Sequence, residues 1–154
     1  MQTVYRLTLE DALIILEAAE AEAARIGVKQ TICVADDGAH PIAVHRMTGA
    51  RLTGVDIAIA KAFTAAGHQR PTHLFNEPPN GPALPGNEAF GIQHMHPGKF
   101  TVFVGGFPIV HEGQIVGAVG VSGGSGEQDK AVGAAALAAF EEHVAGARLG
   151  KESS

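Results

Sequence analysis

The histidines in the second half of the chain are the residues best suited to chemistry. His94 and His96 lie two positions apart in a proline- and glycine-rich segment, and His111 follows downstream. Imidazole is a frequent metal ligand, and a single histidine can bind haem iron axially. Two histidines at i and i+2 reach one ion only from an extended segment. We therefore expect His94 and His96, with His111 as a further candidate, to contact haem or a divalent metal; the alternative is that they are solvated side chains.

A second set of residues predicts an internal ion pair. Lys61 lies within the apolar helical run 57–63, where an ammonium group needs a partner or a path to solvent. The acidic residues Glu127 and Asp129, which open the last predicted helix, are the candidate partners. Such a pair is either a structural tie, which we favour, or the charged wall of a ligand pocket. Arg70 completes this second set of candidate ligand-binding residues.

The glycine-rich stretch 120–126 joins a predicted strand to a predicted helix. Residues 120–124 match the G-x-S-x-G pattern of a nucleophile elbow, but only one histidine, His143, follows them in this short chain, so a serine nucleophile is disfavoured. No Gly-Lys-Ser/Thr follows, which excludes a P-loop. Two interpretations remain, a backbone nest for an anion and simple capping of the helix.

Hydrophobic periodicity predicts the order helix, two strands, helix, loop, three strands, helix. The first two helices begin at the pairs Thr8 with Asp11 and Thr53 with Asp56, and the last runs from about residue 127 to about residue 143. The predicted strands are 30–35, 41–47, 101–104, 108–111 and 114–121. Strands joined by short turns imply an antiparallel sheet, which the helices at both ends of the chain must cover.

The irregular segment 78–98 differs in kind from the rest of the chain. It holds five of the eight prolines, four glycines and two histidines. Irregular loops of this length in a compact domain are usually functional or mobile. We therefore expect a ligand or a partner subunit to be found here.

Composition narrows the classes of function. The 154 residues are expected to form one domain, 1–154. A net charge of −5 and an aromatic content of 5% without Trp argue against binding of nucleic acid. The single cysteine, Cys33, excludes an intramolecular disulfide. The chain lacks the pattern of a signal peptide or a membrane span, so we expect no membrane partner and a cytoplasmic location.

Several blocks of the chain, in the same order, resemble the GlcG/HbpS family, the haem-degrading or DUF336 group that includes the C-terminal domain of PduO. The resemblance extends from about Leu7 to Phe140. The blocks are residues 36–38, 57–62, 70–72, 106–110 and 116–130.

The resemblance implies an α/β fold of the α+β type, a profilin-like three-layer α/β/α sandwich around an antiparallel sheet of about five strands. It also implies homo-oligomers, from dimers to octamers, with ligand pockets near subunit contacts, and haem binding in some members. We therefore expect a small-molecule or haem-binding oligomeric domain that is accessory to a catabolic pathway. The alternatives are an acid/base or metal-assisted isomerase or hydrolase that uses the 78–98 loop, and a purely accessory subunit.

Overall fold

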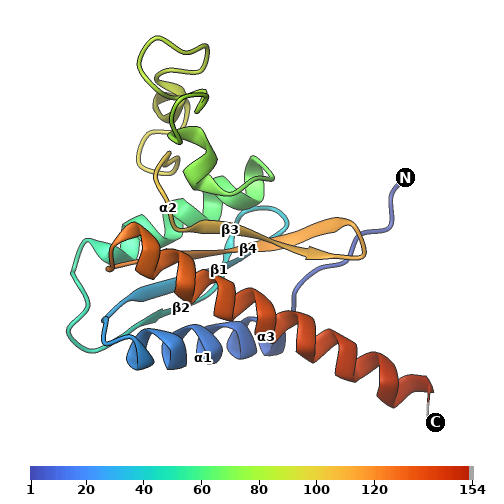
Figure 1. The fold of residues 1–154 in the computed structure, drawn as a ribbon. Coiled ribbons are helices and arrows are strands. Elements are labelled where there is room, and N and C mark those ends of the chain that lie inside the picture. Colours follow the sequence, from blue (N-terminus) through green and yellow to red (C-terminus); the bar gives the residue numbers. More distant parts are fainter. Residues whose placement is uncertain (153–154) are drawn as a thin grey trace.

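The fold is α+β, and the computed structural model describes residues 1–152 (Figure 1). Within this range, three α-helices accompany one sheet of four antiparallel strands in the order β2-β1-β4-β3. The helices are α1 (Leu9–Arg25), α2 (Gly54–Gly67) and α3 (Gly126–Glu152), and the strands are β1 (Thr31–Asp36), β2 (Pro41–Arg46), β3 (Gly106–His111) and β4 (Gln114–Ser122). In the described range, no helix is both long enough and apolar enough to cross a membrane.

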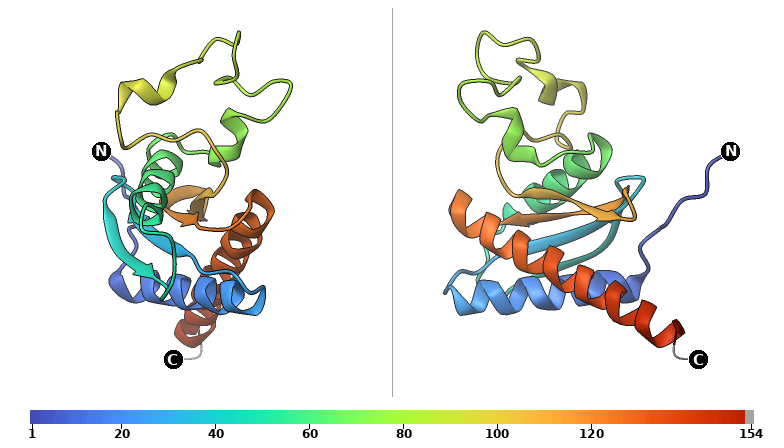
Figure 2. Two further views of the ribbon diagram at one scale, coloured as in Figure 1. Left: turned by 90° about the vertical axis from the view of Figure 1, so that its left-hand side faces the viewer. Right: turned by 45° about the vertical axis from the view of Figure 1, so that its right-hand side comes forward.

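The helices cover both faces of the sheet. α1 and α3 pack against each other on one face and α2 lies on the other (Figure 1, Figure 2). The central strand β1 shows the division, because successive side chains of a strand point to opposite faces. Ile32 and Val34 join the core formed with α1 and α3, whereas Cys33 packs with Ala58 and Ala62 of α2. Burial raises the pKa of the Cys33 thiol to about 12, so this cysteine is an inert core residue.

The two cores differ in the size of their side chains. The core between the sheet and helices α1 and α3 contains large residues such as Ile15, Leu16 and Phe140. The contact between the sheet and α2 instead uses alanine, cysteine and glycine. At Gly120 on β4, an added Cβ would collide with the carbonyl oxygen of Ala58 and the amide nitrogen of Ala62. The backbone of α2 therefore lies directly on β4, at a distance that only glycine allows.

Two local predictions are confirmed and one is wrong. Thr8 and Asp11 form a reciprocal capping box at the start of α1. The hairpin between β3 and β4 turns at Glu112 and Gly113, whose φ angles are +48° and +76°, as a type I′ turn requires. Thr53 makes no side-chain capping bond to α2, because its backbone is already helical and does not adopt the extended conformation of an N-cap.

The sheet has four strands, not about five, because residues 101–104 do not form the predicted strand. Side-chain hydroxyls take up backbone donors that a strand would use. The amide of Thr101 donates to Thr64 Oγ1 at 2.9 Å, and that of Gly106 donates to Thr72 Oγ1 at 2.8 Å. The segment is thereby tied to α2 and to the short 3₁₀ turn Thr72–Phe75 and does not extend the ladder of β4.

The last helix is longer than predicted. α3 continues past His143 to Glu152, and its final turns extend beyond the sheet (Figure 1). Alanine-rich sequence favours a continued helix. The ion pair between Arg148 and Glu112 also holds these turns against the tip of the β3–β4 hairpin.

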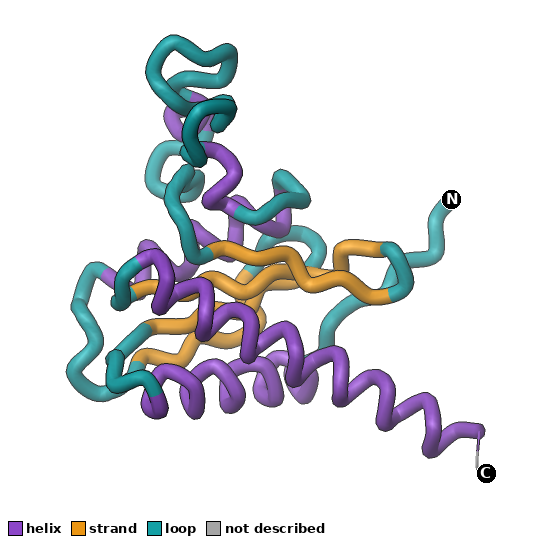
Figure 3. Tube along the Cα trace, in the orientation of Figure 1, coloured by secondary structure: helices purple, strands orange, loops and turns teal. Residues whose placement is uncertain are grey.

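The predicted irregular loop is confirmed and projects from the body as an arm, residues 76–99 (Figure 3). Its own hydrogen bonds order it: the amide of Ala83 donates to the carbonyl of Phe75 at 2.9 Å, and Asn87 Nδ2 donates to that of Gly81 at 2.8 Å. A second 3₁₀ turn, Ile92–Met95, lies within it. The arm presents its polar and apolar side chains to solvent on several sides.

Replacing Gly120 by Ala tests the close seating of α2. The added methyl group meets backbone atoms, so relief requires the helix to move, and we expect unfolding to become easier by about 3 kcal/mol or more. The matched control is Gly146→Ala in α3, where nothing lies within 4 Å of an added Cβ; there we expect a gain of about 0.5–1 kcal/mol. Urea unfolding followed by circular dichroism measures both, and a Gly120→Ala protein as stable as the original would contradict the packing described.

Candidate functional site

Lys61 and Asp129 form the predicted ion pair. Lys61 Nζ lies 2.8 Å from Asp129 Oδ2 and donates a second hydrogen bond to the carbonyl oxygen of Val121 at 2.6 Å. Each side chain is only 4% exposed. Burial lowers the pKa of the Lys61 amine, and the carboxylate of Asp129 opposes that shift. The pair joins α2 to the start of α3.

The second oxygen of Asp129 is also occupied. Oδ1 accepts hydrogen bonds from Gln30 Nε2 at 2.7 Å and from the amide of Gly124 at 3.1 Å. Both carboxylate oxygens are therefore satisfied by the protein. Because this carboxylate fills the position at which the glycine-rich turn would hold an anion, the geometry favours the structural tie over a nest or a pocket wall.

The turn before α3 caps the helix. The amide of Ser125 donates to Gln128 Oε1 at 2.9 Å, and the amide of Gln128 donates to Ser125 Oγ at 3.3 Å. This reciprocal arrangement is a capping box. The histidine that the elbow interpretation needed, His143, lies 3.3 Å from Asp11 on α1.

The other two members of the charged set lie apart from this pair. The Glu127 side chain is 88% exposed and reaches only Lys130, at 3.5 Å. Arg70 lies over the ring of Phe75, 4.8 Å from its centroid, and makes no ion pair with a carboxylate of the described residues. The structure thus brings together Lys61 and Asp129 but not Glu127 and Arg70, whose ligand-binding roles stay predictions.

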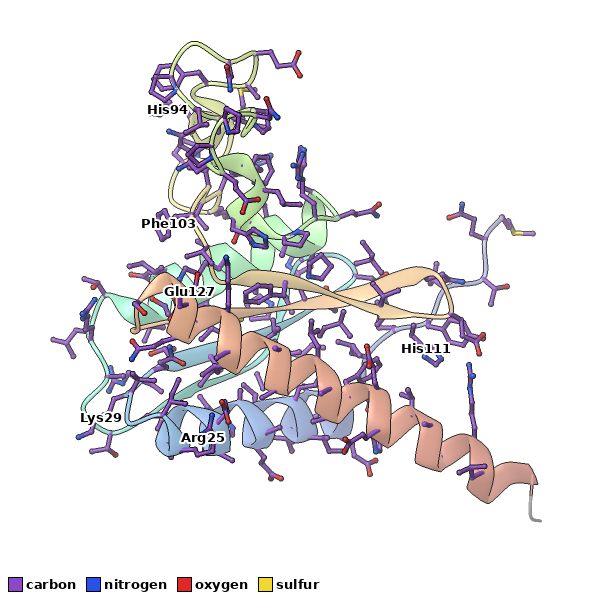
Figure 4. All side chains as sticks on the ribbon, in the orientation of Figure 1. Arg25, Lys29, His94, Phe103, His111 and Glu127 are labelled. Atoms are coloured by element: carbon purple, nitrogen blue, oxygen red, sulfur yellow. The ribbon has the colours of Figure 1, made fainter. Side chains whose placement is uncertain are left out.

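The predicted metal-binding histidines are also separated. His94 lies on the exposed arm and His111 beside the β3–β4 turn, at opposite sides of the molecule (Figure 4). Within residues 1–152 no group of three or more His, Cys, Asp or Glu side chains is placed to hold a metal ion. A role for His94, His96 or His111 in metal binding therefore stays a prediction for each residue by itself.

An apolar pocket lies where the arm returns to α2. Its volume is about 130 Å³, and α2, the β1–β2 turn and the base of the arm contribute its walls. The lining residues are Ala39, His40, Pro41, Ile59, Ala60, Phe63, Gly98 and Lys99. The ring of His96 packs edge-on against that of Phe63, with centroids 5.5 Å apart. Through this ring contact with Phe63, the predicted site residue His96 borders the cavity.

His40 was not singled out in the sequence analysis. It directly follows a tight turn at Ala39, whose φ is +64°, and its side chain is exposed. Its ring joins the pocket because α2 packs beside the β1–β2 turn, a contact between segments about twenty residues apart. Neither His40 nor His96 uses its ring nitrogens in a hydrogen bond with the described residues, so both imidazoles are free to bind a ligand.

Comparison with known proteins identifies relatives over nearly the whole chain. The model of the family described as haem degrading protein HbpS-like matches residues 7–138. An uncharacterised 15.0 kDa protein from the dhaT-dhaS intergenic region of Citrobacter freundii is 35% identical over 92% of this chain and 96% of its own length. Protein GlcG of Escherichia coli K12 is 38% identical over 79% of this chain and 85% of its own length.

Solved structures show the same fold. Protein ORFY of Klebsiella pneumoniae superposes with a TM-score of 0.86 at 33% identity, over 92% of this chain and 94% of the other. PduOC in complex with haem superposes with a TM-score of 0.82 at 29% identity, over 88% of this chain and 95% of the other. The match to the corrinoid adenosyltransferase PduO of Citrobacter freundii covers only 39% of that protein.

Removing Lys61 tests the buried pair. In Lys61→Met the carboxylate of Asp129 stays buried without its cation, and we expect a loss of about 3–5 kcal/mol in unfolding free energy. Adding Asp129→Asn should recover much of that loss, because Asn removes the charge and retains the oxygen that faces Gln30 and Gly124. Urea denaturation measures each variant, with Lys130→Met as the exposed control. A deficit no larger than the control's would show that the pair contributes nothing.

Proposed function

This chain belongs to the HbpS-like family of haem-degrading proteins, and on that premise we propose that it binds haem at the pocket between α2 and the base of the arm. The observation that carries the proposal is the pocket itself, an apolar cavity bordered by free imidazoles. The haem complex of the structurally similar PduOC supports the choice of ligand. His96 is the proposed axial ligand.

The residues at the pocket fit the chemical parts of haem. Ile59, Pro41 and Phe63 offer an apolar wall to the macrocycle. His96 and His40 offer nitrogen donors to the iron, and Lys99, which makes no ion pair within residues 1–152, offers a cation to a propionate. When bound, haem would supply an iron centre for redox or ligand-binding chemistry.

The pocket is smaller than the ligand. Cavities that enclose drug-sized molecules measure about 300–1,000 Å³, whereas this one measures about 130 Å³. The pocket would therefore take one edge of the macrocycle, and the rest would lie against the outer surface of α2 or the arm. A second copy of the chain could cover that remainder, in keeping with the expected homo-oligomer, and the arm offers exposed apolar side chains at Phe90 and Met95 for such a contact.

The alternative of an acid/base enzyme at the loop gains no support from the geometry. That mechanism needs the loop histidines to converge with Lys61, Glu127 and Asp129 within hydrogen-bond reach. Lys61 and Asp129 instead form a buried ion pair with each other. His94 lies at the far side of the arm from Glu127 (Figure 4).

A titration of untagged protein with hemin, followed at the Soret band, tests the proposal. We expect a saturable shift in the original protein. His96→Ala should weaken binding at least about tenfold, equivalent to roughly 1.4 kcal/mol, because the iron loses its proposed ligand. The matched control is His94→Ala, two positions away on the exposed arm, for which we expect an unchanged affinity.

The variants test haem binding and the identity of the iron-binding residue separately. A normal shift in His96→Ala with a lost shift in His40→Ala would move the axial role to His40 while haem binding at this pocket stands. A loss in His94→Ala alone would place the ligand on the outer arm, against the proposal. Absence of a saturable shift in the original protein would overturn haem binding itself.

A further inference from the structure

A groove lies on the opposite side of the molecule from His94, beside His111 (Figure 4). Two adjoining cavities of about 310 Å³ and 150 Å³ form it and share the lining residues His111 and Val144. We call it the His111 groove. Its walls are the N-terminal segment, the start of α1, the β3–β4 hairpin and the last turns of α3; the residues that line it include Tyr5, Leu7, Val110, Phe140, Glu141 and Arg148.

The floor of the groove is apolar and well packed. Leu7, Val116 and Phe140 belong to the main core and are nearly fully buried. The imidazole of His111 lies between two rings: its centroid is 4.9 Å from that of Tyr5 and 6.2 Å from that of Phe140, both edge-on. Its nitrogens make no hydrogen bond with the described residues. The groove therefore offers a supported aromatic surface and one free imidazole.

The positive charges at the groove are already used within the chain. Arg148 pairs with Glu112 at the hairpin tip, and the Tyr5 hydroxyl donates to the same carboxylate at 2.9 Å. Arg6 pairs with Asp37 at 2.7 Å, and the Asp37 carboxylate holds the pKa of that guanidinium above its ordinary value. An anionic ligand would therefore have to displace an existing carboxylate.

One negative charge at the groove is free. Asp11 is engaged by the Thr8 backbone and by His143. Glu141, by contrast, lines the larger cavity and makes no hydrogen bond or ion pair within the described part of the chain. It lies on α3 next to Phe140 and three residues before Val144, so this free carboxylate borders the apolar wall directly.

We infer that the His111 groove binds a small organic cation, an ammonium group carried on an apolar ring or branched chain. The ammonium pairs with Glu141, and the apolar body covers Phe140 and Val144 and meets the face of His111. An apolar surface with one oriented charge is the usual composition of a small-molecule site. The inference does not depend on haem binding, because the two sites share no residue.

The single tyrosine makes the groove observable. The chain contains one Tyr and no Trp, and Tyr5 lines the smaller cavity, so intrinsic fluorescence reports on this groove. We would titrate the 154-residue chain with cyclohexylmethylamine, a non-fluorescent ammonium with a compact apolar ring. We expect a saturable change in tyrosine emission. Cyclohexanecarboxylate, of similar shape and opposite charge, should produce no saturable change.

Two neighbouring carboxylates provide matched variants. Glu141→Gln should weaken amine binding about fivefold, since an exposed ion pair contributes modestly. Glu142→Gln, which removes an exposed charge from α3 outside the groove, should leave the affinity unchanged. Equal losses in both variants would reduce the effect to general surface charge, and equal binding of amine and carboxylate, or no saturable change with the amine, would overturn the inference.

Discussion

The buried bond between Lys61 and Asp129 is the interaction on which the arrangement of layers depends. The sheet separates α2 from α3, and the pair crosses from one helix to the other at the end of β4, where Val121 and Gly124 supply further partners. Two charges removed from water are costly unless every polar atom is satisfied. Gln30 Nε2 donates to the other carboxylate oxygen of Asp129, while Gln30 Oε1 is buried without a partner among the described residues. The network also fixes the entry into β1. A single polar cluster thus sets the relative positions of both helical layers and the central strands.

The close packing of α2 on β4 also fixes the position of the ligand pocket. Small side chains and Gly120 let the helix backbone rest on β4, so its outer face holds a fixed position. Thr64 on this helix and Thr72 just beyond it then accept the amides of Thr101 and Gly106, which fixes the returning end of the arm. Ile59 and Phe63, on the outer face, meet the arm base as a consequence. The pocket beside His96 is therefore a product of core packing more than of the arm's own sequence.

The features that sequence could predict are local or depend on a strong energetic requirement. The capping box at Thr8 and the turn at Glu112 follow from residues within four positions of each other. The partner of Lys61 could be inferred because a buried ammonium demands an acid and the last helix opens with two. The missing strand at 101–104 could not be foreseen, since the amide of Thr101 is bonded to the hydroxyl of Thr64, 37 residues away. His40 lines the pocket because segments distant in the sequence pack together, and hydrophobic periodicity cannot predict such a contact.

The two proposed sites lie in different parts of the molecule, and the elements that support them differ. At the pocket, one wall belongs to the core helix α2 and the other to an arm held mainly by its own short-range hydrogen bonds. At the His111 groove, Phe140 and Val116 belong to the main core, and Glu112 at the hairpin tip binds both Tyr5 and Arg148. A ligand bound at the pocket would therefore contact both the core helix and the base of the arm. Binding at the groove would act instead on the Tyr5–Glu112–Arg148 contacts, which share no residue with the pocket.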